Sequence, residues 1–103
     1  DCGAATGAPG LDIIPARIDG LLHDGEGTFD WSVSPAFAER ELPPQQSPRF
    51  AAGDALFFDH FFLHRTQYRA PGTPPFSRPR YAVETWFFAE SRAPANQVPL
   101  SWR

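Results

Sequence analysis

With 103 residues and a formal net charge of −3, the chain suffices for one small domain, residues 1–103, and its scattered basic residues predict neither nucleic acid nor membrane as a partner. Ten Phe, three Trp and two Tyr provide core side chains, whereas twelve Pro and eight Gly exclude long helices and favour short strands joined by turns. No stretch approaches the roughly 20 apolar residues of a membrane-spanning helix.

The first ten residues are rich in Gly and Ala and predict a loop. The chain begins with Asp1 and contains no Met, as expected for an internal piece of a longer translation product. Cys2 is the only cysteine, so no intrachain disulfide can form, which fits a reducing cytoplasm. The apolar run over residues 11–14, which Pro15 ends, predicts a short strand.

Two further elements are predicted before the middle of the chain. Over residues 28–34 apolar and polar side chains alternate, with Phe29, Trp31 and Val33 on one face, which predicts a half-buried strand. Ser34 and Pro35 are typical of a helix N-cap and first helical residue, and the helix can continue to Glu41 before a proline pair ends it.

The second half predicts strands and turns. Gly53 and Asp54 predict a tight turn, and the apolar run over residues 55–65 predicts two strands or one bent strand. A proline-rich loop, residues 70–79, precedes residues 80–88, whose β-branched and aromatic side chains favour another strand. Short strands joined by Gly and Pro loops, with no alternation of strands and helices, predict an all-β sandwich or jelly roll.

The three histidines are the first candidates for metal binding, because neutral imidazole binds first-row metals. His23 lies in Leu-His-Asp-Gly, a context typical of a solvated turn. His60 and His64 lie in the apolar run, where composition alone favours a hydrogen-bonded core histidine over a metal ligand.

A longer pattern is more specific than any of these residues. The stretch Gly-Asp-Ala-Leu-Phe-Phe-Asp-His-Phe-Phe-Leu-His-Arg-Thr, residues 53–66, is followed by Arg-Tyr-Ala-Val at residues 80–83. Together they resemble the C-terminal part of the phytanoyl-CoA dioxygenase family of iron(II)- and 2-oxoglutarate-dependent dioxygenases. Gly-Leu-Asp-Ile-Ile-Pro, residues 10–15, also resembles the family's strand that ends at a proline. The resemblance covers about residues 9–90, and its specific motifs lie from residue 53 onward.

The resemblance implies a double-stranded β-helix, a cupin-like jelly roll, of which this chain is an incomplete C-terminal portion. It implies an enzyme that oxidises a small molecule while decarboxylating 2-oxoglutarate to succinate. His64 is then the third Fe(II) ligand, Thr66 helps to hold 2-oxoglutarate, and Arg80 pairs with the far carboxylate of that co-substrate; no catalytic residue is implied beyond these ligands. Guanidinium suits that carboxylate because its planar fork makes two parallel charge-assisted hydrogen bonds.

Residue-level alternatives remain beside this interpretation. Taken alone, Arg80 is typical of a surface cation and Thr66 of a strand residue. Arg78 competes with Arg80 as the anchor, because it also precedes the predicted strand. Small Ala82, two residues after Arg80 and therefore on the same face of a strand, leaves room for a ligand beside Arg80.

In one respect the chain departs from the family, because no histidine is followed two residues later by a carboxylate. The His-x-Asp half of the iron site is therefore missing, and we expect the 103 residues alone to be inactive. Two other function classes stay open: a non-enzymatic, cupin-like module that binds a small ligand, and a β-rich interaction domain in which His60 and His64 are core or interface residues. The primary substrate and the oligomeric state are not readable from these residues.

Overall fold

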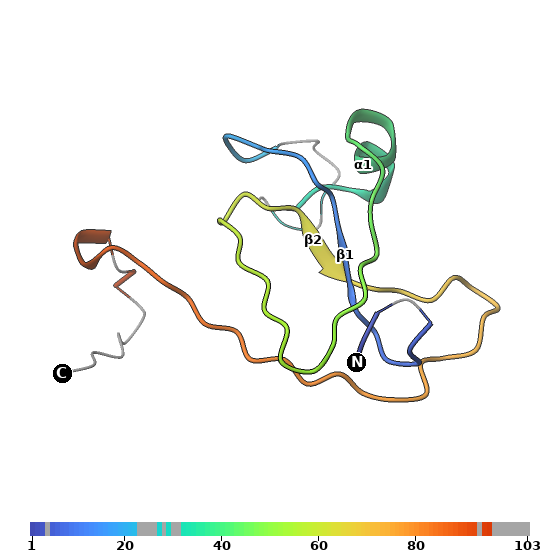
Figure 1. Cartoon of the computed structure of the whole chain (residues 1–103). Coiled ribbons are helices and arrows are strands. Elements are labelled where there is room, and N and C mark those ends of the chain that lie inside the picture. Colours follow the sequence, from blue (N-terminus) through green and yellow to red (C-terminus); the bar gives the residue numbers. More distant parts are fainter. Residues whose placement is uncertain (4, 23–26, 28, 30–31, 93, 96–103) are drawn as a thin grey trace.

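Two segments that are far apart in the sequence form the central feature of the fold, a two-stranded antiparallel sheet (Figure 1). In the computed structural model, which describes residues 1–3, 5–22, 27, 29, 32–92 and 94–95, strand β1 is Leu11–Ile13 and strand β2 is His64–Thr66. Leu11 lies opposite Thr66, Asp12 opposite Arg65 and Ile13 opposite His64. The predicted strand over residues 11–14 is thus confirmed at its first three positions.

Backbone hydrogen bonds extend this pairing at both ends and on the second edge of β1. The Gln67 N–H donates to the Gly10 carbonyl at 3.1 Å, and the Ile14 N–H donates to the Leu63 carbonyl at 3.0 Å. On the other edge, Ile13 and Gln46 exchange two backbone hydrogen bonds of 2.8 Å. Strand β1 therefore lies between β2 and the segment at residue 46, and Ile13 makes its backbone hydrogen bonds on the second edge.

The apolar run over residues 55–65 contains less strand than predicted, because only its last two residues belong to β2. Asp59 supplies the physical reason. Its Oδ1 accepts the Phe61 N–H at 3.0 Å, and its carbonyl accepts the Phe62 N–H at 3.2 Å. An aspartate that bonds the backbone in this way forms a turn and competes with strand pairing.

Helix α1 spans Pro35–Glu41 and confirms the predicted helix. The Oγ of Ser34 accepts the Phe37 N–H at 3.1 Å, and Pro35 occupies the first turn, where its missing N–H leaves no bond unmade. The helix ends at Leu42, whose backbone is extended. The strand predicted just before it, over residues 28–34, includes positions 28, 30 and 31, which lie outside the described residues.

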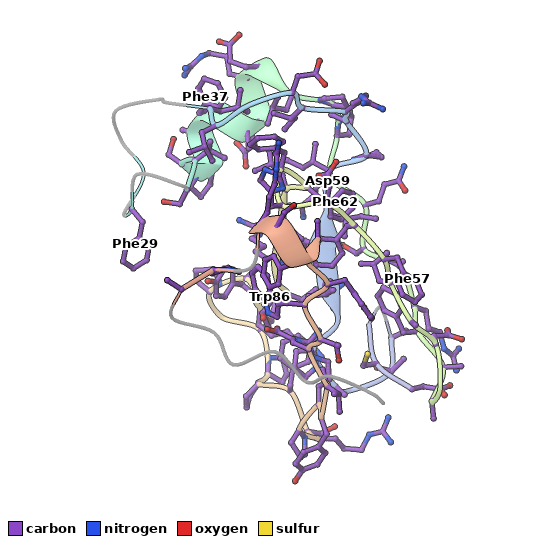
Figure 2. All side chains as sticks on the ribbon, turned by 90° about the vertical axis from the view of Figure 1, so that its left-hand side faces the viewer. Phe29, Phe37, Phe57, Asp59, Phe62 and Trp86 are labelled. Atoms are coloured by element: carbon purple, nitrogen blue, oxygen red, sulfur yellow. The ribbon has the colours of Figure 1, made fainter. Side chains whose placement is uncertain are left out.

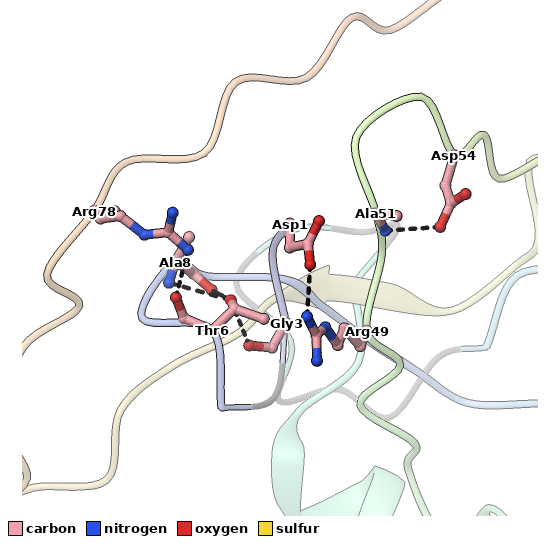
Figure 3. Close-up of polar contacts among 8 residues, drawn as sticks. All are labelled: Asp1, Gly3, Thr6, Ala8, Arg49, Ala51, Asp54 and Arg78. Atoms are coloured by element: carbon pink, nitrogen blue, oxygen red, sulfur yellow. Dashed lines mark hydrogen bonds and ion pairs between the residues drawn. The ribbon is translucent and has the colours of Figure 1, made fainter.

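The predicted turn at Gly53 and Asp54 is confirmed (Figure 3). Asp54 donates its N–H to the Ala51 carbonyl at 3.2 Å, and its Oδ2 accepts the Ala51 N–H at 2.8 Å. Gly53 has φ +95°, a left-handed conformation that glycine adopts without a Cβ penalty.

The N-terminal loop is docked against the last residues of the proline-rich loop, residues 70–79. The Gly7 carbonyl accepts the N–H groups of Ser77 and Arg78 at 2.9 and 3.0 Å, and Nη2 of Arg78 donates to the Thr6 carbonyl at 2.6 Å (Figure 3). Gly3 has φ +102°, and a Cβ there would lie 2.3 Å from the Pro48 carbonyl oxygen. This close approach of two backbones requires glycine at position 3.

Residues 80–88 do not form the predicted strand. They run away from the sheet without regular pairing (Figure 1), and Tyr81, Val83 and Phe87 are 92%, 94% and 79% exposed. A strand is stable only when its backbone groups are paired, and no described segment pairs with this one. The 3-10 helix η1, Glu90–Arg92, follows.

The described residues bury little side-chain volume. Among them, Ala8 is the one buried apolar residue, at 3% exposure, and Asp12 the one buried charged residue, at 7%. The radius of gyration is 16.1 Å, against about 13 Å for a compact domain of this length. One short sheet and one short helix do not define a jelly roll, so that fold stays a prediction. None of the helices in the described part of the chain is long and apolar enough to cross a membrane.

Candidate functional site

His64 and Thr66 lie on one face of the two-stranded sheet. Directly opposite residues of an antiparallel pair share a face, so Ile13 and Leu11 lie beside them, while Asp12 and Arg65 occupy the other face. Both His64 and Thr66 are exposed, whereas Arg65 between them is half-buried. The sheet therefore presents the predicted metal ligand and the predicted co-substrate hydroxyl side by side on an open surface.

A backbone carbonyl fixes the tautomer of His64. Nδ1 of its ring lies 3.0 Å from the Phe62 carbonyl oxygen. A carbonyl can only accept a hydrogen bond, so Nδ1 carries the proton and Nε2 of the neutral ring keeps its lone pair. Histidines that bind a metal through one ring nitrogen commonly donate from the other to a carbonyl or carboxylate. In this tautomer Nε2 of the neutral His64 ring has a lone pair that a metal could use.

Two phenylalanine rings support the same imidazole. The ring centroids of Phe58 and Phe62 lie 4.6 and 6.2 Å from that of His64, and the two phenylalanine rings are 5.3 Å apart. These contacts restrict the rotation of an otherwise exposed side chain. The sequence analysis did not predict these ring contacts, although the paired phenylalanines before His64 were a signal for them.

The other histidines do not join this site. His60 lies in the turn after residue 59 and contacts the ring of Phe61, with centroids 3.9 Å apart. His23 lies outside the described residues. In the part of the chain that the structure describes, no group of three or more His, Cys, Asp or Glu side chains could hold a metal ion. These residues offer iron one donor, so they do not fit a complete iron site by themselves.

The two arginines that compete as co-substrate anchor have different surroundings. Arg78 is committed to the N-terminal loop through its Nη2 bond to Thr6 and its backbone bond to Gly7. Arg80 is half-buried and makes no hydrogen bond or ion pair with the described residues. Its five N–H donors are therefore available to a ligand, whereas part of the Arg78 fork is already used. Arg80 lies outside the sheet, and no described contact joins it to His64 or Thr66.

On the opposite face, a polar cluster that the sequence did not predict holds the sheet together. Nε of Arg65 donates to Oδ2 of Asp12 at 3.2 Å, and Ser47 Oγ donates to Oδ1 of Asp12 at 2.7 Å. Nη2 of Arg65 also donates to Gln45 Oε1 at 3.0 Å. The signal available in the sequence was one acidic residue inside an otherwise apolar strand.

Comparison of the chain with protein-family models, with curated proteins and with solved structures finds no match. Its function is therefore inferred from the residues of this site and from the way the sheet arranges them.

Proposed function

We propose that these 103 residues are the C-terminal part of an Fe(II)/2-oxoglutarate dioxygenase of the phytanoyl-CoA dioxygenase type. Such an enzyme converts a substrate C–H group, 2-oxoglutarate and dioxygen into the hydroxylated product, succinate and carbon dioxide. The structure supports this proposal by pairing the two segments that carry the resemblance. Strand β1 lies in Gly-Leu-Asp-Ile-Ile-Pro and β2 starts at the proposed iron ligand, about fifty positions later. Two strands of one barrel are expected to meet in this way.

The observation that carries the proposal is the hydrogen bond from His64 Nδ1 to the Phe62 carbonyl. In the neutral ring this bond would leave Nε2 of an exposed side chain able to bind Fe(II). When bound, the iron supplies the activation of dioxygen. The chain's own contribution is to hold the imidazole in one tautomer and one orientation.

The co-substrate is held by Thr66 and Arg80 in this proposal. Thr66 is two residues from His64 on the same strand face, so a ligand beside the metal can reach its hydroxyl. Arg80 is half-buried and its guanidinium makes no hydrogen bond or ion pair with the described residues, which suits a side chain that pairs with a carboxylate.

The remaining iron ligands come from a His-x-Asp segment outside these 103 residues. No His-x-Asp pair occurs in the sequence, and a facial triad needs two histidines and one carboxylate. The exposed aromatic side chains of residues 81–88 support the same view, because further strands of a barrel would pair with this segment and bury them. We call the polypeptide that carries both this segment and the 103 residues the extended polypeptide.

The test is succinate release from 2-oxoglutarate in the presence of Fe(II) and ascorbate. We expect turnover by the extended polypeptide, none by the 103-residue chain, and a loss of at least a hundredfold for His64→Ala in the extended polypeptide. His60→Ala is the matched control and should keep turnover within about twofold, because His60 is exposed and its one ring contact among the described residues is with Phe61.

Two results would contradict different parts of this proposal. Robust turnover by the 103-residue chain would show that no iron ligand is missing from it. Binding of 2-oxoglutarate to the extended polypeptide without succinate release would instead identify a cupin-like binding module.

A further inference from the structure

A cavity lined mainly by phenylalanine lies beside the candidate iron ligand. It has a volume of about 260 Å³, is open to solvent and is lined by Phe57, Phe58, Phe61 and Phe62, of which Phe57 is 81% exposed, with Ile18 and Arg17 contributed by the chain after β1. Phe57 and Phe62 are labelled on this stretch in Figure 2. The turn formed by Asp59 is what brings phenylalanines from both of its sides to one cavity.

The wall of this cavity is continuous with His64. Phe58 and Phe62, which stack on each other at 5.3 Å, are also the two residues whose rings contact the imidazole. A ring placed against Phe58 and Phe62 therefore packs on the same aromatic cluster that positions the imidazole. Offset stacking and edge-to-face contacts among aromatic rings contribute about 0.5–1.5 kcal/mol per pair beyond the area that they bury.

Size and charge restrict the ligand further. A cavity of about 150 Å³ is enough for benzene, and drug-sized ligands need about 300 Å³ or more. The 260 Å³ of this cavity therefore suits one or two fused rings. Arg17 is paired with Asp19 at 3.3 Å, and Asp59 adds a negative charge to the lining. The net charge around the cavity thus disfavours an anion.

We infer that this cavity binds the flat, uncharged ring system of the primary substrate. As a statement about a substrate, the inference rests on the proposed dioxygenase function. As a statement about a ligand site, it rests on the lining, volume and charge of the cavity, so the two can be tested separately.

The experiment measures binding of 2-naphthol to the metal-free 103-residue chain by isothermal titration calorimetry, with 2-naphthoate as the anionic probe of the same shape. We expect 2-naphthol to bind at least tenfold more tightly than 2-naphthoate. Phe62→Ala should weaken 2-naphthol binding at least fivefold. Phe58→Leu, at a position that is 47% exposed and therefore safe for folding, should weaken it at least threefold.

Phe76→Ala is the matched control for Phe62→Ala, because both phenylalanines are half-buried. Phe76 lines a different cavity, and its ring centroid lies 4.4 Å from the Arg69 guanidinium. It should change the affinity less than twofold. Equal binding of the two probes, or equal losses in Phe62→Ala and Phe76→Ala, would overturn the inference even if the extended polypeptide turns over 2-oxoglutarate. The expected binding pattern combined with no succinate release by the extended polypeptide would leave the cavity established and overturn the dioxygenase assignment.

Discussion

Asp12 and Arg65 lie directly opposite each other in the sheet and form an ion pair of 3.2 Å between Oδ2 and Nε. The two partners are unequal, because the Asp12 side chain is 8% exposed and that of Arg65 is 39% exposed. Water can solvate the arginine if the carboxylate is removed, but it reaches the carboxylate poorly if the arginine is removed. Arg65 is the neighbour of His64 in β2, so loss of the ion pair would also disturb the strand that carries the candidate site.

We predict that Arg65→Met destabilises the sheet more than Asp12→Asn. Loss of the arginine leaves a buried carboxylate with only the Ser47 hydroxyl, which costs about 1–3 kcal/mol, whereas Asp12→Asn costs about 0.5–1.5 kcal/mol. Amide hydrogen exchange at Ile14 and Gln67, whose N–H groups close the two ends of the strand pairing, reports this opening free energy. Arg17→Met is the control, because its ion pair with Asp19 is exposed. Equal effects of Arg65→Met and Asp12→Asn would show that burial of Asp12 does not matter.

We predict that Arg80, rather than Arg78, anchors 2-oxoglutarate. Arg80→Lys in the extended polypeptide should weaken the binding of 2-oxoglutarate about tenfold, which corresponds to about 1.4 kcal/mol of binding free energy. The reason is that lysine keeps the positive charge but cannot make the paired hydrogen bonds of arginine. Arg78→Lys should leave this affinity within twofold, because Arg78 holds the Thr6 carbonyl instead. Equilibrium titration with 2-oxoglutarate measures the affinity of each variant. The reverse order of effects would assign the anchor to Arg78.

Helix α1 depends on its N-cap. Ser34→Ala removes the oxygen that accepts the Phe37 N–H at 3.1 Å and should destabilise the helix by about 1 kcal/mol. Cα chemical shifts over residues 35–41 would move toward coil values. Ser34→Asp keeps an acceptor and is the control, which should retain the helical shifts. An unchanged spectrum of Ser34→Ala would mean that packing, and not the cap, fixes the start of the helix.

The tautomer of His64 is a direct prediction for the 103-residue chain. Long-range proton–nitrogen correlation spectra of the neutral ring should show a protonated Nδ1 and an unprotonated Nε2, because the Phe62 carbonyl accepts from Nδ1. His60 has no such carbonyl partner in the described structure and should show the mixture of tautomers usual for an exposed imidazole. A proton on Nε2 of His64 would contradict the proposed mode of metal binding.

The elements that the sequence predicted correctly are those that local chemistry determines. Ser34 and Pro35 define the start of α1, and the run that ends at Pro15 defines β1. The extent of β2 was overestimated because Asp59, inside the apolar run, forms a turn through its own side chain. Residues 80–88 have the composition of a strand but lack a partner in the described chain, and composition alone does not reveal whether a partner is present.

The candidate site also combines residues that the sequence pattern identified with contacts that the sequence could not predict. His64, Thr66 and Arg80 were identified from their pattern in the sequence, and their roles stay predictions. The sheet face that His64 and Thr66 share, and the Asp12–Arg65 pair beneath it, depend on contacts between residues about fifty positions apart. Local periodicity does not determine such a register; the backbone pairing of β1 with β2 does.

The central claim is that His64 binds iron, and the affinity of the extended polypeptide for Fe(II) tests it most directly. Anaerobic titration of the wild type, His64→Ala and His60→Ala would give three dissociation constants. Since loss of one protein ligand removes a third of a facial triad, His64→Ala should raise the dissociation constant by about a hundredfold or more, and His60→Ala should leave it within about twofold. Equal iron affinities of the wild type and His64→Ala would contradict the account.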